Sequence, residues 1–192
     1  LLYRLFQRAV GARRASEILA GSFIRAQSGQ RILDVGCGQG AILAHLPGVV
    51  YKGIDINEAY IKVAREQWRV RGSFVVGGAD MMTDFPDNSF EIVLGLGYLH
   101  HVDSEEAGKF LANAGRLLVR GGRVVTADPV YYPGQSRFAR WLVSQDRGQN
   151  VRDLDAYRQL MQPYFSNYRE TLVHDILHIP YTSLVMEGIR DF

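Results

Sequence analysis

The chain has 192 residues, of which 47% are hydrophobic and 22% charged, a balance that predicts one folded domain over residues 1–192 and argues against wholesale disorder. Its formal net charge of +2 is too small to indicate a nucleic-acid-binding face. The single cysteine, Cys37, excludes an intrachain disulfide and a cysteine-built zinc cluster, so we expect a reducing, cytoplasmic setting and no metal site. No apolar run approaches the ~18 residues that a membrane-spanning helix needs.

The N-terminal region, residues 1–28, has the pattern of a helical cap. Apolar side chains recur at helical spacing over residues 1–11 and again over residues 14–27. Two interpretations remain open for this cap. It either packs against the edge of the domain or closes over a ligand as a lid, with Tyr3 pointing inward.

Residues 31–128 alternate between short apolar runs and amphipathic segments. Asn57 and Ser104 are expected to cap the helices that follow them, and Gly121-Gly122 is expected to end the second of these helices. Alternating strands and helices with short connections predict parallel pairing and right-handed crossovers. The fold class is therefore α/β, a doubly wound Rossmann-like sheet with ligands at the carboxyl ends of its strands. The expected strands span residues 31–35, 49–55, 73–77, 90–95 and 123–127.

The last region, residues 129–192, departs from this alternation and is expected to hold acceptor-side helices and closing strands. A helical turn is predicted around Phe138 and Trp141, and a helix over residues 153–162. Residues 168–174 and 177–186 are predicted to be an antiparallel strand pair that closes the sheet.

The first strand runs into a loop that has glycines at positions 36, 38 and 40. Glycines carry no Cβ, so backbone N–H groups in such a loop can approach a ligand closely. The spacing Gly36-x-Gly38-x-x-Ala41 fits the dinucleotide pattern, and Asp55 ends the second strand, where an acid would meet ribose hydroxyls. This motif alone does not separate NAD from another adenosine cofactor.

Two further acids favour a cofactor with an amino-acid part. Asp34 interrupts an otherwise apolar strand, where a carboxylate is costly unless it meets donors or a cation such as an ammonium group. Asp80 follows the third strand, where it could accept a hydrogen bond from an adenine amino group.

Five stretches between residues 31 and 128 occur in the order and spacing of a known family. They read LDVGCGQG, GIDIN, GAD, LGLGYLHHV and LLVRGGRVV. Together they resemble the class I S-adenosylmethionine-dependent methyltransferases, close to the small-molecule branch that includes the ubiquinone-biosynthesis type enzymes. The resemblance implies S-adenosylmethionine as cofactor, S-adenosylhomocysteine as product and methyl transfer to a small-molecule acceptor.

The resemblance also implies roles for individual residues. Asp55 would hold the ribose hydroxyls, with Ile56 against the adenine ring. Asp80 would accept from the adenine amino group, flanked by Ala79 and Met81, while Leu96 and Gly97 would contact the cofactor by backbone and packing. The amino-acid part of the cofactor would lie along Asp34, Gly36, Cys37, Gly38 and Gly40.

Catalysis needs little from the protein, because the sulfonium already makes the methyl carbon electrophilic. The protein must place a nucleophile in line and exclude water, and a general base helps only with some acceptors. His100 and His101 follow the fourth strand and are candidates for that base, although a structural role in the loop is equally open. Asp128 follows the fifth strand, and Pro129 is expected to aim it at the pocket.

The acceptor would lie against the region after the fifth strand. Tyr131 and Tyr132 could wall it, and His174 and His178 are expected in core or surface roles. Four arginines could bind a phosphorylated or carboxylated acceptor, or instead form ion pairs within the cap. These are Arg137, Arg140, Arg147 and Arg152.

Two other functions remain as alternatives. One is a noncatalytic adenosine-cofactor-binding domain, which would bind the cofactor without turnover. The other is an NAD-binding oxidoreductase, against which the short chain offers little room for a separate catalytic domain.

Overall fold

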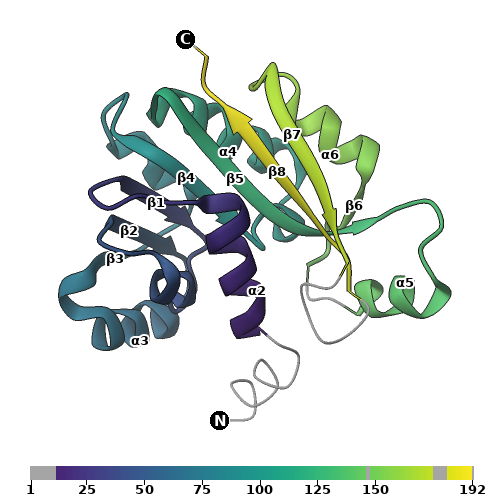
Figure 1. Ribbon diagram of the computed structural model, residues 1–192, viewed down its shortest axis with the longest axis horizontal. Coiled ribbons are helices and arrows are strands. Elements are labelled where there is room, and N and C mark those ends of the chain that lie inside the picture. The colour runs from purple at the N-terminus through teal and green to yellow at the C-terminus, as the bar shows by residue number, and fades with distance from the viewer. Residues whose placement is uncertain (1–11, 146–147, 175–180, 192) are drawn as a thin grey trace.

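The protein is built on one mixed sheet. A computed structural model describes residues 12–145, 148–174 and 181–191. Its eight strands follow the order β3-β2-β1-β4-β5-β8-β7, with β6 paired to β5 off this path (Figure 1). Strands β1 to β5 pair in parallel, and β8 lies antiparallel between β5 and β7. The predicted fold class is therefore confirmed. The strands span Arg31–Val35 (β1), Val50–Asp55 (β2), Gly72–Val76 (β3), Phe90–Leu96 (β4), Leu118–Tyr131 (β5), Arg152–Asp153 (β6), Asn167–Val173 (β7) and Ser183–Ile189 (β8).

Helices cover both faces of the sheet, because alternate residues of each buried strand point to opposite sides. In β1, Ile32 packs with the N-terminal helices and α3, whereas Leu33 packs with α4 and α6. The α-helices span Ala12–Ile18 (α2), Glu58–Trp68 (α3), Ser104–Leu117 (α4), Arg137–Ser144 (α5) and Leu154–Met161 (α6). A π-helix continues α2 over Leu19–Ile24, and 3₁₀ helices span Ala41–His45, Arg69–Arg71, Ala79–Asp84 and Leu99–His101.

The parallel strands end together along one edge of the sheet. Asp34 of β1 pairs with Gly53 of β2, and Leu96 of β4 pairs with Ala127 of β5. The carboxyl ends of these strands, and the loops that follow them, therefore lie side by side, as expected for the ligand edge of a doubly wound sheet.

The boundaries of α4 differ from the sequence prediction. Its N-cap is Asp103, whose carboxylate accepts a hydrogen bond from the Glu106 amide at 2.9 Å, so Ser104 is the first helical residue rather than the cap. The helix ends at Leu117 and not at Gly121-Gly122. Those glycines lie inside β5, where backbone bonds to Arg190 hold them in the sheet (2.8 and 2.9 Å). Pairing across the sheet thus sets this boundary.

The C-terminal strand pair is confirmed, with one strand shifted. β7 nearly matches the predicted strand, but β8 begins at Ser183 because its residues from Ser183 to Ile189 pair with both β5 and β7. Residues 177–180 of the predicted strand, and residues 1–11 with Tyr3, lie outside the described residues. Asn57 caps α3 as predicted, accepting from the amides of Ala59 and Tyr60. In the described part of the chain, no helix is long and apolar enough to cross a bilayer.

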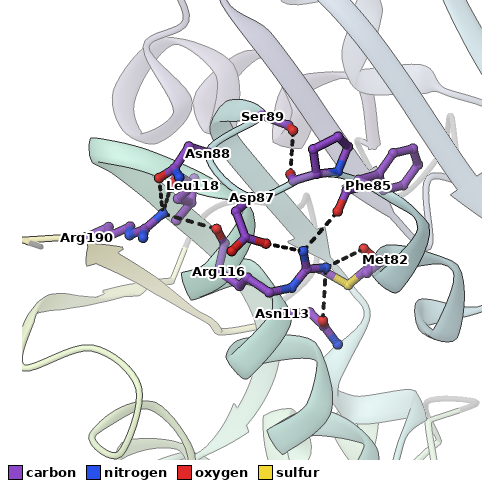
Figure 2. Close-up of polar contacts among 10 residues, drawn as sticks. Met82, Phe85, Asp87, Asn88, Ser89, Asn113, Arg116, Leu118 and Arg190 are labelled. Atoms are coloured by element: carbon purple, nitrogen blue, oxygen red, sulfur yellow. Dashed lines mark hydrogen bonds and ion pairs between the residues drawn. The ribbon is translucent and has the colours of Figure 1, made fainter.

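Two arginines tie together the amino edge of the sheet, opposite the ligand edge (Figure 2). The Arg116 guanidinium donates to the carbonyls of Met82 and Phe85 (2.8 and 2.9 Å) and to Asp87 (2.6 Å). The Arg190 guanidinium donates to the Asn88 amide oxygen (2.6 Å) and to the Leu118 carbonyl. The loop before β4, the end of α4 and the end of β8 are therefore joined at this edge.

Candidate functional site

The glycine loop folds back across the end of β2. The amides of Gly36 and Cys37 both donate to the Ile54 carbonyl, at 2.8 and 3.0 Å. Gly36 has a φ of +73°, and a Cβ there would approach the Tyr98 ring to 3.0 Å, so glycine is required for both conformation and space. Positive φ values also occur at Gly38 and Gly40. The loop thus packs against the segment that follows β4.

Asp55 lies at the centre of this edge, half-buried at the end of β2. One carboxylate oxygen accepts from the Gly38 amide and the other from the Asn57 amide, both at 2.8 Å. These bonds hold the carboxylate between the glycine loop and the start of α3. A carboxylate has about four acceptor sites, so each oxygen keeps capacity for a ribose hydroxyl.

Asp34 is buried at the carboxyl end of β1, with only 2% of its surface exposed. The Tyr51 hydroxyl donates to its Oδ2 at 2.5 Å, while its Oδ1 has no hydrogen-bond partner among the described residues. Burial raises the pKa of Asp34 to about 7, against the hydrogen bond from Tyr51, and the nearby charge of Asp55 raises it further. A buried carboxylate with one unpartnered oxygen is what a cationic donor would satisfy.

Gly78 keeps a narrow space open between Ile56 and Asp80. A Cβ built on Gly78 would lie 2.8 Å from Asp80 Oδ1 and 3.7 Å from Ile56 Cγ2. Ile56 is 79% exposed, which is unusual for an isoleucine and leaves one apolar face open to a flat ring. Of the two residues beside Asp80, Ala79 is buried, and the Met81 side chain lies over the backbone of Gly77.

Cys37 has a packing role in this loop. Its thiol is buried against Gly53, where an added Cβ would lie 2.7 Å from the sulfur. Burial raises the pKa of this thiol further above its usual value, so it is not a reactive thiolate.

The segment after β4 joins the cofactor edge to β5. The Gly97 amide donates to the Ala127 carbonyl at 2.8 Å, directly beyond the paired residue Leu96. Both residues are therefore at the sheet edge beside the glycine loop, where sequence reasoning expected them.

His100 and Asp128 form a buried pair at the ends of β4 and β5. His100 Nδ1 lies 2.8 Å from Asp128 Oδ1, and the His100 amide donates to the same oxygen at 3.1 Å. Asp128 Oδ2 is buried without a hydrogen-bond partner among the described residues. Asp128 is 2% exposed, and its Oδ1 is turned toward His100. The exposed His101 ring lies 4.0 Å from that of His100.

A cleft of about 530 Å³ opens beyond β5. Tyr131, Tyr132 and Arg140 line it, and the Arg140 guanidinium lies 4.6 Å from the centre of the Tyr131 ring. A second cleft on the other side of Arg140 is lined by Tyr131, Arg137, Trp141 and Ser144.

Arg152 borders the first cleft but is not available to an acceptor. Its guanidinium donates to the Leu99 carbonyl at 2.6 Å and to the Val102 carbonyl at 2.9 Å, so it ties β6 to the loop after β4. His174 has a packing role, with Nδ1 3.1 Å from the Thr182 hydroxyl. Arg147 and His178 lie outside the described residues.

Sequence reasoning missed Tyr51 and Tyr98. Tyr51 holds Asp34, and Tyr98 packs on Gly36; neither has a motif of its own. The one available signal for Tyr51 was a polar hydroxyl in a strand that parallel pairing places beside β1. Among the described residues no cluster of histidine, cysteine or carboxylate side chains could hold a metal ion.

The residues at this edge fit S-adenosylmethionine. The unpartnered Asp34 oxygen suits its ammonium group, Asp55 suits its ribose, and the space at Gly78 between Ile56 and Asp80 suits its adenine. Pyrophosphate of NAD would gain nothing from the buried carboxylate of Asp34.

Comparison with known proteins agrees with this geometry. A family model described as a methyltransferase domain matches residues 33–126. Phthiotriol/phenolphthiotriol dimycocerosates methyltransferase of Mycobacterium leprae is 34% identical over 106 residues, which cover 53% of this chain and 38% of that protein. The 27-O-demethylrifamycin SV methyltransferase of Amycolatopsis mediterranei is 34% identical over 127 residues, covering 62% of this chain and 46% of that protein. The match thus spans less than half the length of these relatives.

A solved structure shows the same fold over 97% of this chain. The S-adenosylmethionine-dependent methyltransferase from Archaeoglobus fulgidus superposes with a TM-score of 0.77 at 17% identity, covering 97% of this chain and 99% of that one. At this identity the likeness establishes the fold alone, whereas the domain match establishes the family. Residues 33–126 therefore form a methyltransferase domain of the class I S-adenosylmethionine-dependent family.

Proposed function

We propose that this chain transfers a methyl group from S-adenosylmethionine to a small-molecule acceptor that carries an anionic group. The single observation that carries the proposal is the set of acids at the carboxyl edge, Asp34, Asp55 and Asp80, around a glycine loop in a methyltransferase domain. The single buried cysteine and the match to small-molecule enzymes support the further proposal that the protein works in the cytoplasm.

The carboxyl edge would hold the cofactor as follows. Asp34 would accept from the ammonium group and Asp55 from the ribose hydroxyls, while Ile56 would cover the adenine ring and Asp80 would accept from its amino group. When bound, the cofactor supplies an electrophilic methyl group. The glycine loop would lie beneath its amino-acid part, along Gly36, Cys37, Gly38 and Gly40, with Ala79, Met81, Leu96 and Gly97 packing around the rest.

The acceptor would enter the cleft beyond β5. Tyr131 and Tyr132 offer flat apolar walls, and Arg140 offers a guanidinium that makes no ion pair with the described residues. An arginine held over an aromatic ring suits a carboxylate or phosphate, which it can bind through two parallel hydrogen bonds. This arrangement supports an acceptor with an apolar body and one anionic group.

Catalysis would rest on placement. His100 is buried and bonded to Asp128, so we assign this pair the role of holding the segment after β4 beside the methyl donor. His101 is exposed beside it and remains a candidate for a base in contact with the acceptor.

Calorimetry tests the cofactor assignment. We expect micromolar binding of S-adenosylmethionine and S-adenosylhomocysteine, and a loss of about tenfold to a hundredfold in Asp55→Ala, because charge-assisted hydrogen bonds to the ribose are removed. Glu66→Ala, which removes an exposed carboxylate of α3, serves as the control and should bind normally. Saturable binding of NAD, with no heat from either sulfur compound, would refute the proposal.

The acceptor is tested on the same protein with a panel of paired compounds. Each pair shares a nucleophilic oxygen or nitrogen and differs by one carboxylate, and release of S-adenosylhomocysteine is measured. We expect turnover of the carboxylated member and loss of that preference in Arg140→Gln but not in Arg120→Gln. Equal turnover of both members contradicts the anionic acceptor, and cofactor binding without any turnover favours the noncatalytic alternative.

A further inference from the structure

Helix α5 exposes two aromatic side chains next to each other. Phe138 is 58% exposed and Trp141 54% exposed, and their rings stack with centroids 5.9 Å apart at 19°. Other large apolar side chains exposed in the described chain, such as Val70, are aliphatic or stand alone. Exposed and adjacent aromatic rings mark a surface that meets another apolar phase.

The same face of α5 is positively charged. The helix contains Arg137 and Arg140 and no acidic residue. Neither arginine makes an ion pair with a described residue, and both are exposed. The opposite face, with Ala139 and Val143, is buried against the protein, and Arg137 is exposed on the helix beside the two aromatic rings, while Arg140 lies over the Tyr131 ring.

The position of α5 leaves this face accessible. Figure 1 shows the helix at the periphery of the fold, on the arm that follows β5. A flat surface can therefore meet α5 without displacing an element of the sheet.

We propose that α5 docks the protein onto an anionic lipid surface. Aromatic rings insert at the boundary between headgroups and acyl chains, and arginines beside them pair with anionic headgroups. Neither feature suffices by itself on a helix of two turns, and α5 has both on one side. A neutral apolar partner would leave the Arg137 guanidinium uncompensated, which is why the charge pattern favours anionic lipid.

Docking also has a consequence for the acceptor site. Arg140 of α5 lines the cleft beyond β5, so docking of α5 would bring this cleft close to the lipid surface. An acceptor with an apolar body could then enter from the lipid phase. This consequence rests on the proposed function, whereas the docking itself does not.

Vesicle binding tests the proposal on the full chain. Flotation with phosphatidylcholine vesicles, with and without phosphatidylglycerol, should show binding that requires the anionic lipid and weakens at high salt. We expect Phe138→Ser combined with Trp141→Ser to lower the partition coefficient about tenfold or more, and Arg137→Glu to lower it by a similar factor. Val70→Ser and Arg120→Glu, which change an exposed apolar and an exposed basic residue elsewhere, should leave it unchanged.

Tryptophan fluorescence gives a second readout on the unaltered protein. The chain has two tryptophans, and the Trp68 indole is already hydrogen-bonded to the Gln39 carbonyl. A blue shift of the tryptophan emission, and quenching of that emission by brominated lipid, would therefore report on Trp141. Absence of vesicle binding, or binding that ignores lipid charge, overturns the proposal. Self-association through this face would also overturn the proposal. In that case the variant with both Phe138→Ser and Trp141→Ser would become monomeric, and its vesicle binding would not change.

Discussion

The two edges of the sheet differ in how their carbonyl and carboxylate oxygens are hydrogen-bonded. At the amino edge, Arg116 and Arg190 donate to carbonyls and side-chain oxygens of the loop before β4 and of β5 (Figure 2). At the carboxyl edge, Asp34 and Asp128 are buried with one oxygen each unpartnered among the described residues. An unpartnered buried oxygen costs stability, so the Asp34 and Asp128 oxygens indicate where a ligand completes the structure.

This comparison separates stability from binding. Changes at the amino edge should alter the free energy of unfolding and leave cofactor affinity intact. Changes at the carboxyl edge should weaken binding or turnover, and some should stabilise the free protein. Three variants test this division, in order of decreasing effect.

Asp34→Asn should show the largest effect, and it should depend on pH. The unfolded carboxyl ionises near 3.8, whereas the folded one keeps its proton to about 7, so the folded protein loses stability as pH rises between these values. The loss amounts to at most about 4 kcal/mol. Asparagine cannot ionise, so the variant should be more stable than the natural protein at about pH 8 and nearly equal at about pH 4.

Urea unfolding of both proteins across this pH range measures the difference, and calorimetry measures cofactor binding. The variant should bind S-adenosylmethionine more weakly at about pH 8, because the carboxylate that would meet the ammonium group is gone. A variant that is less stable at every pH would show that Asp34 stabilises the fold, and would contradict the division between a stabilising amino edge and a binding carboxyl edge.

Arg116→Ala should lower the free energy of unfolding by about 3 kcal/mol. It removes the guanidinium donor from the Phe85 carbonyl, leaves the Met82 carbonyl with only the Phe85 amide, and releases Asp87. Denaturation in urea measures the loss, and Arg120→Ala, at an exposed position nearby, should cost little. Cofactor affinity measured well below the unfolding midpoint should stay unchanged; a matching loss of affinity would mean that the two edges are coupled.

His100 variants should have the smallest effect, about tenfold in kcat for His100→Ala. Asparagine can place an amide donor where Nδ1 lies and so keep the bond to Asp128, so His100→Asn should recover most of the rate if His100 acts by positioning. Turnover assays with a compound that the natural protein methylates measure the rates of both variants, and cofactor affinity serves as the control. An equal loss in both variants would instead assign proton transfer to the imidazole ring.

The local pattern predicted most of the cofactor edge. Apolar runs ending in glycines or acids placed β1 to β4 within a few residues, and Asn57 was correctly identified as the cap of α3. These features depend on neighbours in the chain, through strand periodicity, capping and positive φ at glycine. The roles of Asp34, Asp55 and Asp80 were implied by the family resemblance and remain to be tested by binding.

Features that depend on distant contacts were predicted less well. The end of α4 was placed at Gly121-Gly122, but pairing with Arg190 draws these glycines into β5. The hydrogen bond between Asp128 and His100, 28 residues earlier, was not predicted. Sequence periodicity carries no information on which strand end meets which loop.

The sequence by itself determined the fold class, the glycine loop and the family, because strand–loop–helix units and their motifs are local. Only the tertiary structure decided which polar groups have hydrogen-bond partners within the protein. It showed that Tyr51 holds Asp34, that Arg152 is bonded to carbonyls, and that Arg140 remains open beside Tyr131. Burial and pairing across the sheet set these states, and they arise only when segments far apart in the chain come together.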